Sequence, residues 1–178
     1  MVKRKTNISP KRTKEREKKI ILACLKLALD KDWDNITISH IAKEADMTSG
    51  ELKELFRSKN AILRAYNRKI DDEVLASIAS IASTENVRDK LFELLMLRFE
   101  LLLDNRQSLA RIIKNIAVRD PIGGLLGVAA TWHSMKAALE ASGVSTCGII
   151  GGVKIKILMA VYLKTLQVWL QDNTPDLS

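Results

Sequence analysis

Apolar residues recur every three or four positions through most of this chain, which is the spacing of one face of an α-helix. Over residues 14–31 they form one such stripe, and over residues 58–82 a second stripe steps by four residues each time, from Ile62 to Ile78. Only 8 glycines and 3 prolines interrupt the 178 residues. The pattern therefore predicts an all-α protein, with Ser58 as the N-cap of the longer helix.

Two shorter helices are predicted between these stripes. Thr37 can cap a helix of about eight residues, and Thr48 can cap the next, with Glu51 completing a capping box. A tight turn at residues 45–47 joins them, and Trp33 precedes them as an expected core residue. This arrangement predicts a helix-turn-helix, whose second helix enters the DNA major groove. Helical hairpins without a DNA-binding role share the pattern, so both interpretations stay open at this point.

The remaining sequence predicts four more hydrophobic helices. They span about residues 87–104, 109–118, 123–141 and 149–171. A helix that is apolar on most faces must be buried on most faces. In a small domain the usual solution is packing against a second copy. We therefore expect a homodimer.

Positive charge is concentrated in the first part of the chain. The whole sequence has 29 Lys+Arg against 21 Asp+Glu, a net charge of +8 and a pI near 9.6. Residues 1–70 hold 18 Lys+Arg and 9 Asp+Glu, whereas residues 71–178 hold 11 and 12. This excess indicates a polyanionic partner, either nucleic acid or an acidic membrane surface. We expect residues 1–15 to form a basic flexible arm, although a charge run by itself also fits a solvated tail.

The sequence carries no pattern for catalysis or for a cofactor. Cys24 and Cys147 are too few for a disulfide framework or a zinc site. No Ser-His-Asp set, paired carboxylate site, phosphate loop or metal-ligand spacing is present. No stretch reaches the roughly 18 apolar residues that a membrane span requires. We therefore expect a reduced, cytoplasmic protein with no enzyme activity, no cofactor, no metal and no membrane span.

The predicted helix-turn-helix reads TISHIAKEADMTSGEL at residues 37–52 and FRSKNAIL at residues 56–63. These segments resemble the DNA-binding domain of the TetR family of bacterial repressors, and the agreement extends over residues 16–66. The resemblance implies a TetR-like all-α fold in three parts. They are the basic arm at 1–15, a three-helix DNA-binding domain at 16–66, and a helical ligand-binding and dimerisation domain at 67–178.

The resemblance also assigns residues to DNA contact: Thr37, Ser39, Thr48, Ser49, Gly50, Glu51, Lys53 and Lys59. The threonines and the glycine would meet phosphates at helix N-termini, where the partial positive charge favours anions. The two serines and Glu51 would face base edges, and the two lysines would each take a phosphate.

Three residues differ from the family pattern. Asp46 stands where a turn glycine is usual, and because Asp tolerates a positive φ better than most residues, we expect the turn to persist. Lys53 replaces a Tyr that meets a phosphate and can supply that contact itself. Leu55 replaces a polar or aromatic residue, which removes one backbone contact.

These observations predict a sequence-specific transcriptional regulator, a repressor, that binds a palindromic operator as a dimer and is released by a small hydrophobic ligand. The leucine-rich span at 91–103 would enclose the ligand pocket, which we expect to be lined by Met96, Phe99, Trp132 and His133. Arg98 would be available for an acidic head group. A simply filled core is an equally open interpretation of these residues.

The last helix supports an alternative function. Its spacing of Tyr162, Thr165, Trp169 and Asp172 is similar to the ubiquinone-biosynthesis accessory family, which shares the TetR fold. This resemblance implies a lipid ligand and a hydroxylase partner in place of DNA. The basic N-terminal part favours the DNA-binding interpretation, because lipid binding has no need of it.

Overall fold

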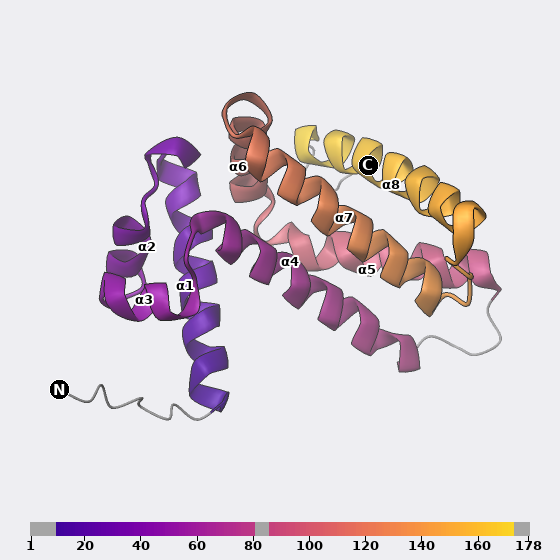
Figure 1. Cartoon of the computed structure of the whole chain (residues 1–178), viewed down its shortest axis with the longest axis horizontal. Coiled ribbons are helices and arrows are strands. Elements are labelled where there is room, and N and C mark those ends of the chain that lie inside the picture. Colours follow the sequence, from indigo (N-terminus) through magenta and orange to yellow (C-terminus); the bar gives the residue numbers. More distant parts are fainter. Residues whose placement is uncertain (1–9, 81–85, 173–178) are drawn as a thin grey trace.

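The structure, a computed structural model, describes residues 10–80 and 86–172. The regular elements in these ranges are helices, and no strand is present there (Figure 1). The α-helices are α1 (Pro10–Asp30), α2 (Ile38–Glu44), α3 (Ser49–Leu55), α4 (Lys59–Ala76), α5 (Val87–Leu103), α6 (Arg106–Arg119), α7 (Pro121–Ala141) and α8 (Gly148–Gln171). Two 3-10 helices, η1 (Trp33–Asn35) and η2 (Ser77–Ser80), follow α1 and α4. The predicted all-α fold class is confirmed.

The first three helices form a small N-terminal unit around an apolar core. The stripe of α1 buries Ile20 and Cys24 completely, and α2 and α3 contribute Ile41 and Leu52, which are also fully buried. Trp33, in η1, is buried beside them, as expected. Because large side chains from all three helices meet, the two short helices are stabilised by tertiary packing rather than by their own length.

Both short helices begin at the predicted caps. The Thr37 hydroxyl accepts a hydrogen bond from the His40 amide, and the Thr48 hydroxyl accepts one from the Glu51 amide, each at 3.2 Å. In the turn between them, Asp46 has a φ of 55°, the positive value predicted for this position. A short polar side chain can adopt this left-handed conformation, so the turn forms without glycine.

Helix α4 leads from the N-terminal unit into a C-terminal bundle of α5 to α8 (Figure 1). It packs against α1 and also against α5 and α7. Its buried residues repeat every four positions, as the sequence predicts: Ile62, Tyr66, Ile70 and Val74. One core continues from the N-terminal unit along α4 into α5 and α6. A second cluster, around Met135, Leu139, Ile155 and Tyr162, joins α7 to α8.

Helix α6 makes a further connection between the two parts. It packs against both α1 and η1. The Arg111 guanidinium donates to the Leu29 carbonyl at the end of α1, and Arg119 lies 3.5 Å from the carboxylate of Asp34 in η1. The N-terminal unit is therefore attached to the bundle through α4 and α6 together.

Element bounds differ most from the sequence-based prediction at two places. Residues 10–15, expected in the flexible arm, form the first turns of α1; Pro10 suits a first helical position, and the lysines, arginines and glutamates that follow favour helix. Residues 1–9 of that arm lie outside the described residues. Helix α4 ends at Ala76 and not near residue 82. There the Ser77 hydroxyl donates to the Val74 carbonyl at 2.7 Å, a bond that competes with continued helix.

Candidate nucleic-acid interface and ligand cavity

The N-terminus of α3 is held by a reciprocal cap. Oε2 of Glu51 accepts hydrogen bonds from the Thr48 backbone N–H and from the Thr48 hydroxyl, both at 2.9 Å. Its other oxygen lies 3.3 Å from the Arg16 guanidinium of α1. The hydrogen bond from the Thr48 backbone, more than any other contact, lowers the pKa of Glu51. This carboxylate is therefore engaged by the cap and by α1, and its predicted contact with base edges would compete with these partners.

Thr37 is also part of a reciprocal cap. Its backbone N–H donates to Nδ1 of His40 at 3.4 Å, and the Thr37 hydroxyl accepts from the His40 amide in return. A histidine thus fills the position that Glu or Gln usually takes in a capping box. Thr37 stands at the exposed start of α2, two residues before Ser39. Both helix starts are consequently fixed by side chains close in the sequence.

Small polar groups gather where α2 and α3 meet. The Ser49 hydroxyl donates to Oγ of Ser39 at 3.3 Å, which brings the two predicted base-reading serines together. Gly50 is exposed, and a Cβ added there would meet nothing closer than Oγ1 of Thr48, at 3.8 Å. The backbone at this end of α3 is therefore open to close approach by another molecule.

The two predicted phosphate-binding lysines have different surroundings. Lys53, on α3, is exposed, and no ion pair engages it within the described ranges. The Lys59 ammonium instead donates to the Trp33 carbonyl and lies 4.8 Å from the centre of the Trp33 ring. Burial lowers the pKa of Lys59. Lys59 therefore fastens η1 to α4, and its predicted phosphate contact would compete with these two interactions.

Unpaired positive charge lies on the elements that form this surface. Arg16 pairs with Glu51, and the Lys19 ammonium lies 3.8 Å from the Asp46 carboxylate, so the first half of α1 lies beside α3 and the turn before it. Other basic side chains of the N-terminal unit are exposed and form no ion pair with described residues: Lys11, Arg12, Lys14, Lys18, Lys43, Lys53 and Arg57. A polyanion would meet this excess charge.

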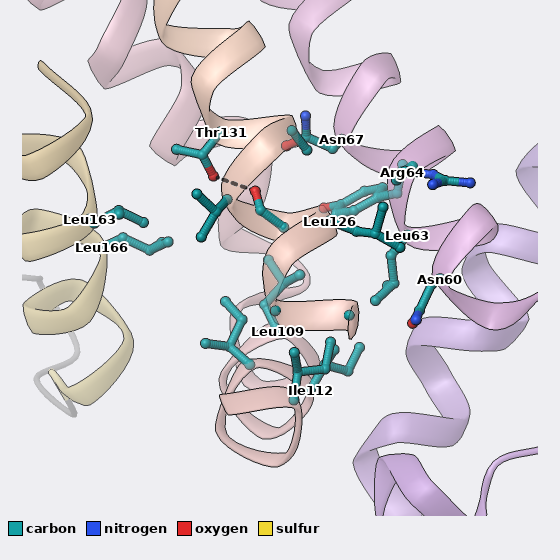
Figure 2. A pocket seen from close by; sticks show the side chains of 18 of the residues that line it. Asn60, Leu63, Arg64, Asn67, Leu109, Ile112, Leu126, Thr131, Leu163 and Leu166 are labelled. Atoms are coloured by element: carbon teal, nitrogen blue, oxygen red, sulfur yellow. Dashed lines mark hydrogen bonds between the residues drawn. The ribbon is translucent and has the colours of Figure 1, made fainter. Parts of the chain in front are cut away.

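A cavity of about 310 Å³ lies between α4 and the bundle, with walls from α4, α5, α6, α7 and α8 (Figure 2). Its lining is mostly apolar and includes Leu63, Leu109, Ile112, Leu126, Leu163 and Leu166. Helix α7 contributes three glycines to the wall: Gly123, Gly124 and Gly127. The volume is at the lower end of the roughly 300–1,000 Å³ that is usual for small-molecule sites.

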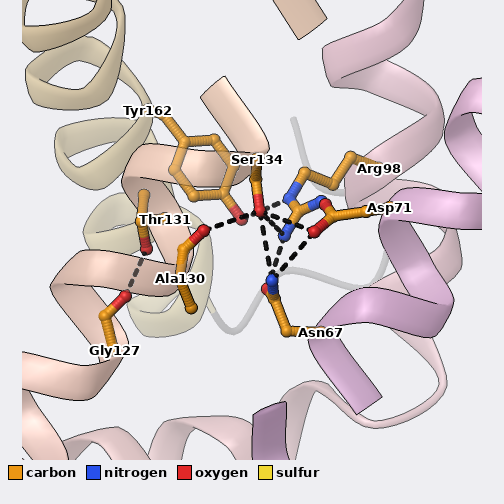
Figure 3. Close-up of polar contacts among 8 residues, drawn as sticks. All are labelled: Asn67, Asp71, Arg98, Gly127, Ala130, Thr131, Ser134 and Tyr162. Carbon is orange, nitrogen blue, oxygen red and sulfur yellow. Dashed lines mark hydrogen bonds and ion pairs between the residues drawn. The ribbon is translucent and has the colours of Figure 1, made fainter. Parts of the chain in front are cut away.

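A buried polar cluster borders this cavity (Figure 3). Arg98, which is 4% exposed, donates to the Asp71 carboxylate, to Oδ1 of Asn67 at 2.7 Å and to the Tyr162 hydroxyl at 3.0 Å. The Ser134 hydroxyl donates to Oδ2 of Asp71 at 2.8 Å. Arg98, Asn67 and Tyr162 also line the cavity. The cluster thus joins the cavity wall to α4, the helix that leads to the N-terminal unit.

The residues predicted to line a ligand pocket lie outside this cavity: Met96, Phe99, Trp132 and His133. Phe99 packs against the rings of Tyr162 and Trp169, with centroids 5.5 and 5.4 Å apart. Trp132 packs on the second cluster, and Met96 and His133 are exposed. The cavity is therefore lined by residues of α5 and α7 other than the ones predicted.

The orientation of α5 explains this difference. Its buried residues are Leu94, Arg98 and Leu102, spaced by four, whereas Met96 lies more than half a turn from Arg98. Apolar residues, mostly leucines, occur on nearly every face of α5, so their periodicity could not show which face is buried. The signal that could have found the cavity was Arg98, an arginine within a leucine-rich helix, together with the glycines at the start of α7.

Other chemistry is limited within the described ranges. No group of three or more His, Cys, Asp or Glu there could hold a metal ion. None of the helices described is long and apolar enough to cross a membrane. Cys24 is buried in the N-terminal core, and Cys147 is exposed just before α8. Serine, threonine and arginine side chains therefore supply most of the candidate chemistry.

Three solved structures that this chain resembles are TetR transcriptional regulators. One from Nitrosomonas europaea has a TM-score of 0.72 at 16% identity, covering 90% of this chain and 88% of that one. One from Rhodococcus sp. RHA1 has a TM-score of 0.63 at 18% identity, covering 95% and 91%. A TetR-family regulator from Syntrophomonas wolfei has a TM-score of 0.66 at 21% identity, covering 88% and 84%. No protein-family model and no curated protein matches the sequence. The chain has the TetR regulator fold, as the resemblance implied.

Proposed function

We propose that this chain, which has the fold of TetR transcriptional regulators, is itself a transcriptional regulator that binds double-stranded DNA. The observation that carries the proposal is the surface formed by Ser39, Ser49, Gly50 and Lys53, here called the α2–α3 surface. It combines small polar groups, an approachable backbone and unpaired positive charge. No catalytic role is part of the proposal.

The α2–α3 surface supplies both kinds of contact that DNA recognition needs. In a helix-turn-helix the first residues of the second helix meet base edges in the major groove. Ser39 and Ser49 hydroxyls can donate and accept, so they suit base edges, while Lys53 suits a phosphate, which carries no sequence information. Thr37 and Thr48 keep their proposed places beside phosphates. The two caps hold these groups in position before DNA arrives, which lowers the ordering cost of binding.

A second copy of the chain would cover the exposed apolar faces of α7 and α8. The side chains concerned are spaced by three or four residues: Ile122, Leu125 and Val128 on α7, and Ile149, Val153, Ile157 and Val161 on α8. Leu125 is 70% and Ile149 is 90% exposed. Contiguous apolar surface of this kind marks an interaction site. A two-fold dimer through these helices would place two α3 helices in successive major grooves, about 34–36 Å apart, and would require a near-palindromic operator.

A ligand in the cavity would alter that spacing. Walls of the cavity come from α4 and α6, and the same two helices attach the N-terminal unit to the bundle. A ligand shifts the equilibrium only if it prefers the arrangement that fits DNA poorly. The proposed regulator is therefore a repressor whose operator is released when a small hydrophobic molecule enters the cavity.

The central experiment is selection of duplexes from a random library by the full chain at two salt concentrations. We expect an enriched near-palindrome, with affinity falling steeply as salt rises because bound phosphates release counterions. Ser49→Ala should change which bases are enriched. Lys53→Met should weaken all sequences alike, and Lys114→Met, which removes an exposed lysine of α6, is the matched control. Weak binding without an enriched sequence would contradict the proposal.

Sedimentation of the full chain tests the dimer. We expect a dimer at micromolar concentration and a monomer for Ile157→Asp, because the new charge would be buried in the interface. Phe92→Asp introduces the same charge at an exposed apolar position on α5, which is 60% exposed, and should leave the dimer intact. A monomeric wild-type chain would contradict binding to paired half-sites.

The lipid-binding alternative gives a different result in the same preparations. Organic extraction of the purified chain would then release an isoprenoid or a phospholipid, while the duplex library would show no enriched sequence. Removal of residues 1–9 would also leave that function intact, whereas DNA affinity should fall when basic residues are removed.

A further inference from the structure

Two tyrosine hydroxyls are the feature of the cavity that the proposed regulator does not yet explain. Tyr66, on α4, and Tyr162, on α8, both line the cavity, and they are 7% and 4% exposed. The wall around them is mostly aliphatic. Buried polar atoms normally have at least one hydrogen-bond partner, and the bonding capacity that each hydroxyl leaves open indicates what the cavity would accept.

Each hydroxyl accepts a hydrogen bond but donates none within the part of the chain that the structure describes. The Tyr66 oxygen accepts from the Asn105 side-chain amide at 3.3 Å, and the Tyr162 oxygen accepts from Nε of Arg98 at 3.0 Å. A tyrosine hydroxyl also carries one hydrogen to donate. Burial raises the pKa of Tyr66, so its hydroxyl keeps that proton at neutral pH. The cavity wall thus holds two phenolic donors with no described acceptor.

The charges around the buried Arg98 disfavour an ionic head group at that part of the cavity. Arg98 is the buried cation of the wall, and its guanidinium is already paired with Asp71 and hydrogen-bonded by Asn67 and Tyr162 (Figure 3). Arg64, the other cation of the lining, is exposed on α4, so a carboxylate placed beside Arg98 would lose its hydration without meeting an uncompensated charge there. An ammonium group would also bind poorly, because the cavity lining contains no carboxylate to pair with it.

A hydrogen-bond donor on the ligand would also find few open acceptors in the cavity wall. The one side-chain oxygen in the wall without a partner in the described ranges is Oδ1 of Asn60, and that atom has no exposed surface. A ligand in the cavity therefore cannot reach it. Oδ1 of Asn67 is already occupied by Arg98. Apart from the Thr131 hydroxyl, which donates to the Gly127 carbonyl and can still accept, the unfilled hydrogen-bonding capacity of the buried wall is that of the two tyrosine donors.

We infer that the cavity takes an uncharged, apolar molecule with a carbonyl or similar acceptor, which receives hydrogen bonds from the Tyr66 and Tyr162 hydroxyls. This inference rests on the proposed function for its biological meaning, since it names the chemical class of the regulator's ligand. It replaces the acidic head group expected near Arg98. Because Tyr162 also holds Arg98, and Arg98 holds Asp71 of α4, the ligand's acceptor would act on the cluster that joins the cavity to α4.

Four probes of similar skeleton test the head group on the full chain in the absence of DNA. They are butyrophenone, butylbenzene, 4-phenylbutyrate and 4-phenylbutylammonium, measured by isothermal titration calorimetry. We expect butyrophenone to bind roughly fivefold or more tightly than butylbenzene, the value of about one net hydrogen bond. Both charged probes should bind more weakly than butylbenzene. Equal affinity for butyrophenone and butylbenzene, or tightest binding of the carboxylate, would overturn the inference.

Variants of Tyr66 and Tyr162 test whether their hydroxyls cause the preference for butyrophenone. Tyr66→Phe and Tyr162→Phe should each reduce the ratio of butyrophenone affinity to butylbenzene affinity, and the double variant should bring this ratio close to one. Butylbenzene thereby serves as the internal control for folding. Gly124→Leu should block every probe, because its side chain would extend toward Ile116 of the cavity wall, whose nearest atom is 3.9 Å from the Cβ position. Preference for the ketone that survives in the double variant would overturn the inference.

Failure here and failure of the proposed function give separate results. A chain that selects an operator but does not distinguish butyrophenone from butylbenzene is a DNA-binding protein with a different ligand. A chain that prefers the ketone through both tyrosines but selects no operator has the inferred site without the proposed function.

Discussion

The N-terminal unit and the C-terminal bundle use the same helical building blocks in opposite ways. In the N-terminal unit, apolar side chains are buried in one core and the surface is charged, with each short helix capped by a residue three positions away. In the bundle, an apolar cavity lies inside and large apolar side chains remain outside on α7 and α8. The first unit covers most of its apolar side chains within one chain, whereas the second leaves an apolar cavity inside and apolar helix faces exposed outside.

The largest effect is expected from Arg98→Met in the bundle. Removing the guanidinium leaves the Asp71 carboxylate without its cation, and breaking a buried pair costs about 3 kcal/mol of unfolding free energy. The double variant Arg98→Met, Asp71→Leu should cost clearly less, because no charge is left buried. Urea denaturation at one fixed protein concentration measures both. Equal losses for the single and the double variant would show that the ion pair is not the source of the cost.

The next largest effect distinguishes two lysines of the N-terminal unit. Lys59→Met removes the hydrogen bond to the Trp33 carbonyl and the charge above its ring, and we expect a loss of about 2 kcal/mol. Lys53→Met should change stability by less than about 0.5 kcal/mol, but should reduce the salt dependence of DNA binding by about one unit of slope. A stable Lys59→Met variant with weakened DNA binding would support the phosphate role for Lys59.

A smaller loss is expected at the cap of α3. Thr48→Ala removes the oxygen that accepts from the Glu51 amide, which should cost about 1 kcal/mol and weaken operator binding. Hydrogen exchange at the Glu51 amide should become faster, and Thr48→Ser should restore protection. Thr165→Ala is the control, because the Thr165 hydroxyl is exposed on α8 and donates only to the Val161 carbonyl of the preceding turn. Unchanged exchange in Thr48→Ala would contradict the cap.

The smallest effect at neutral pH concerns the two cysteines, one in each part. Burial raises the pKa of the Cys24 thiol from 9.0 to about 12. A raised folded-state pKa means that its contribution to stability is complete below about pH 9 and is lost as the pH rises toward 12. At pH 8, a thiol reagent should label exposed Cys147 quickly and Cys24 only on unfolding. Equal labelling rates would contradict the packing of α1, and Cys24→Ala should remove the alkaline loss of stability.

Local features of the fold could be predicted from the sequence because their information is local. The caps at Thr37 and Thr48 each depend on a residue three positions later, and the turn at Asp46 depends on one residue's tolerance of positive φ. The stripe of α4 was equally readable, since one side of that helix is polar. Each of these features depends on short-range geometry, and each is confirmed in the structure.

The candidate sites were less predictable because they depend on what lies beside each helix. Glu51 and Lys59 carry the expected charges, yet Arg16 and Thr48 engage one, and Trp33 engages the other. In α5, apolar residues occur nearly all round the helix, so its pattern could not distinguish the face toward the cavity from the face toward Trp169. The sequence indicates Arg98 as an available cation, but its ion pair with Asp71 forms only in the folded chain.

The sequence by itself determined the helical class, the positions of the short helices and the confinement of positive charge to the first part of the chain. Periodicity, capping and charge are properties of neighbouring residues, and they act before the chain folds. Only the tertiary structure decided which polar side chains stay free, where the cavity lies and which hydroxyls face it. Those outcomes depend on how each helix is rotated and docked, and packing between residues distant in the sequence sets that rotation.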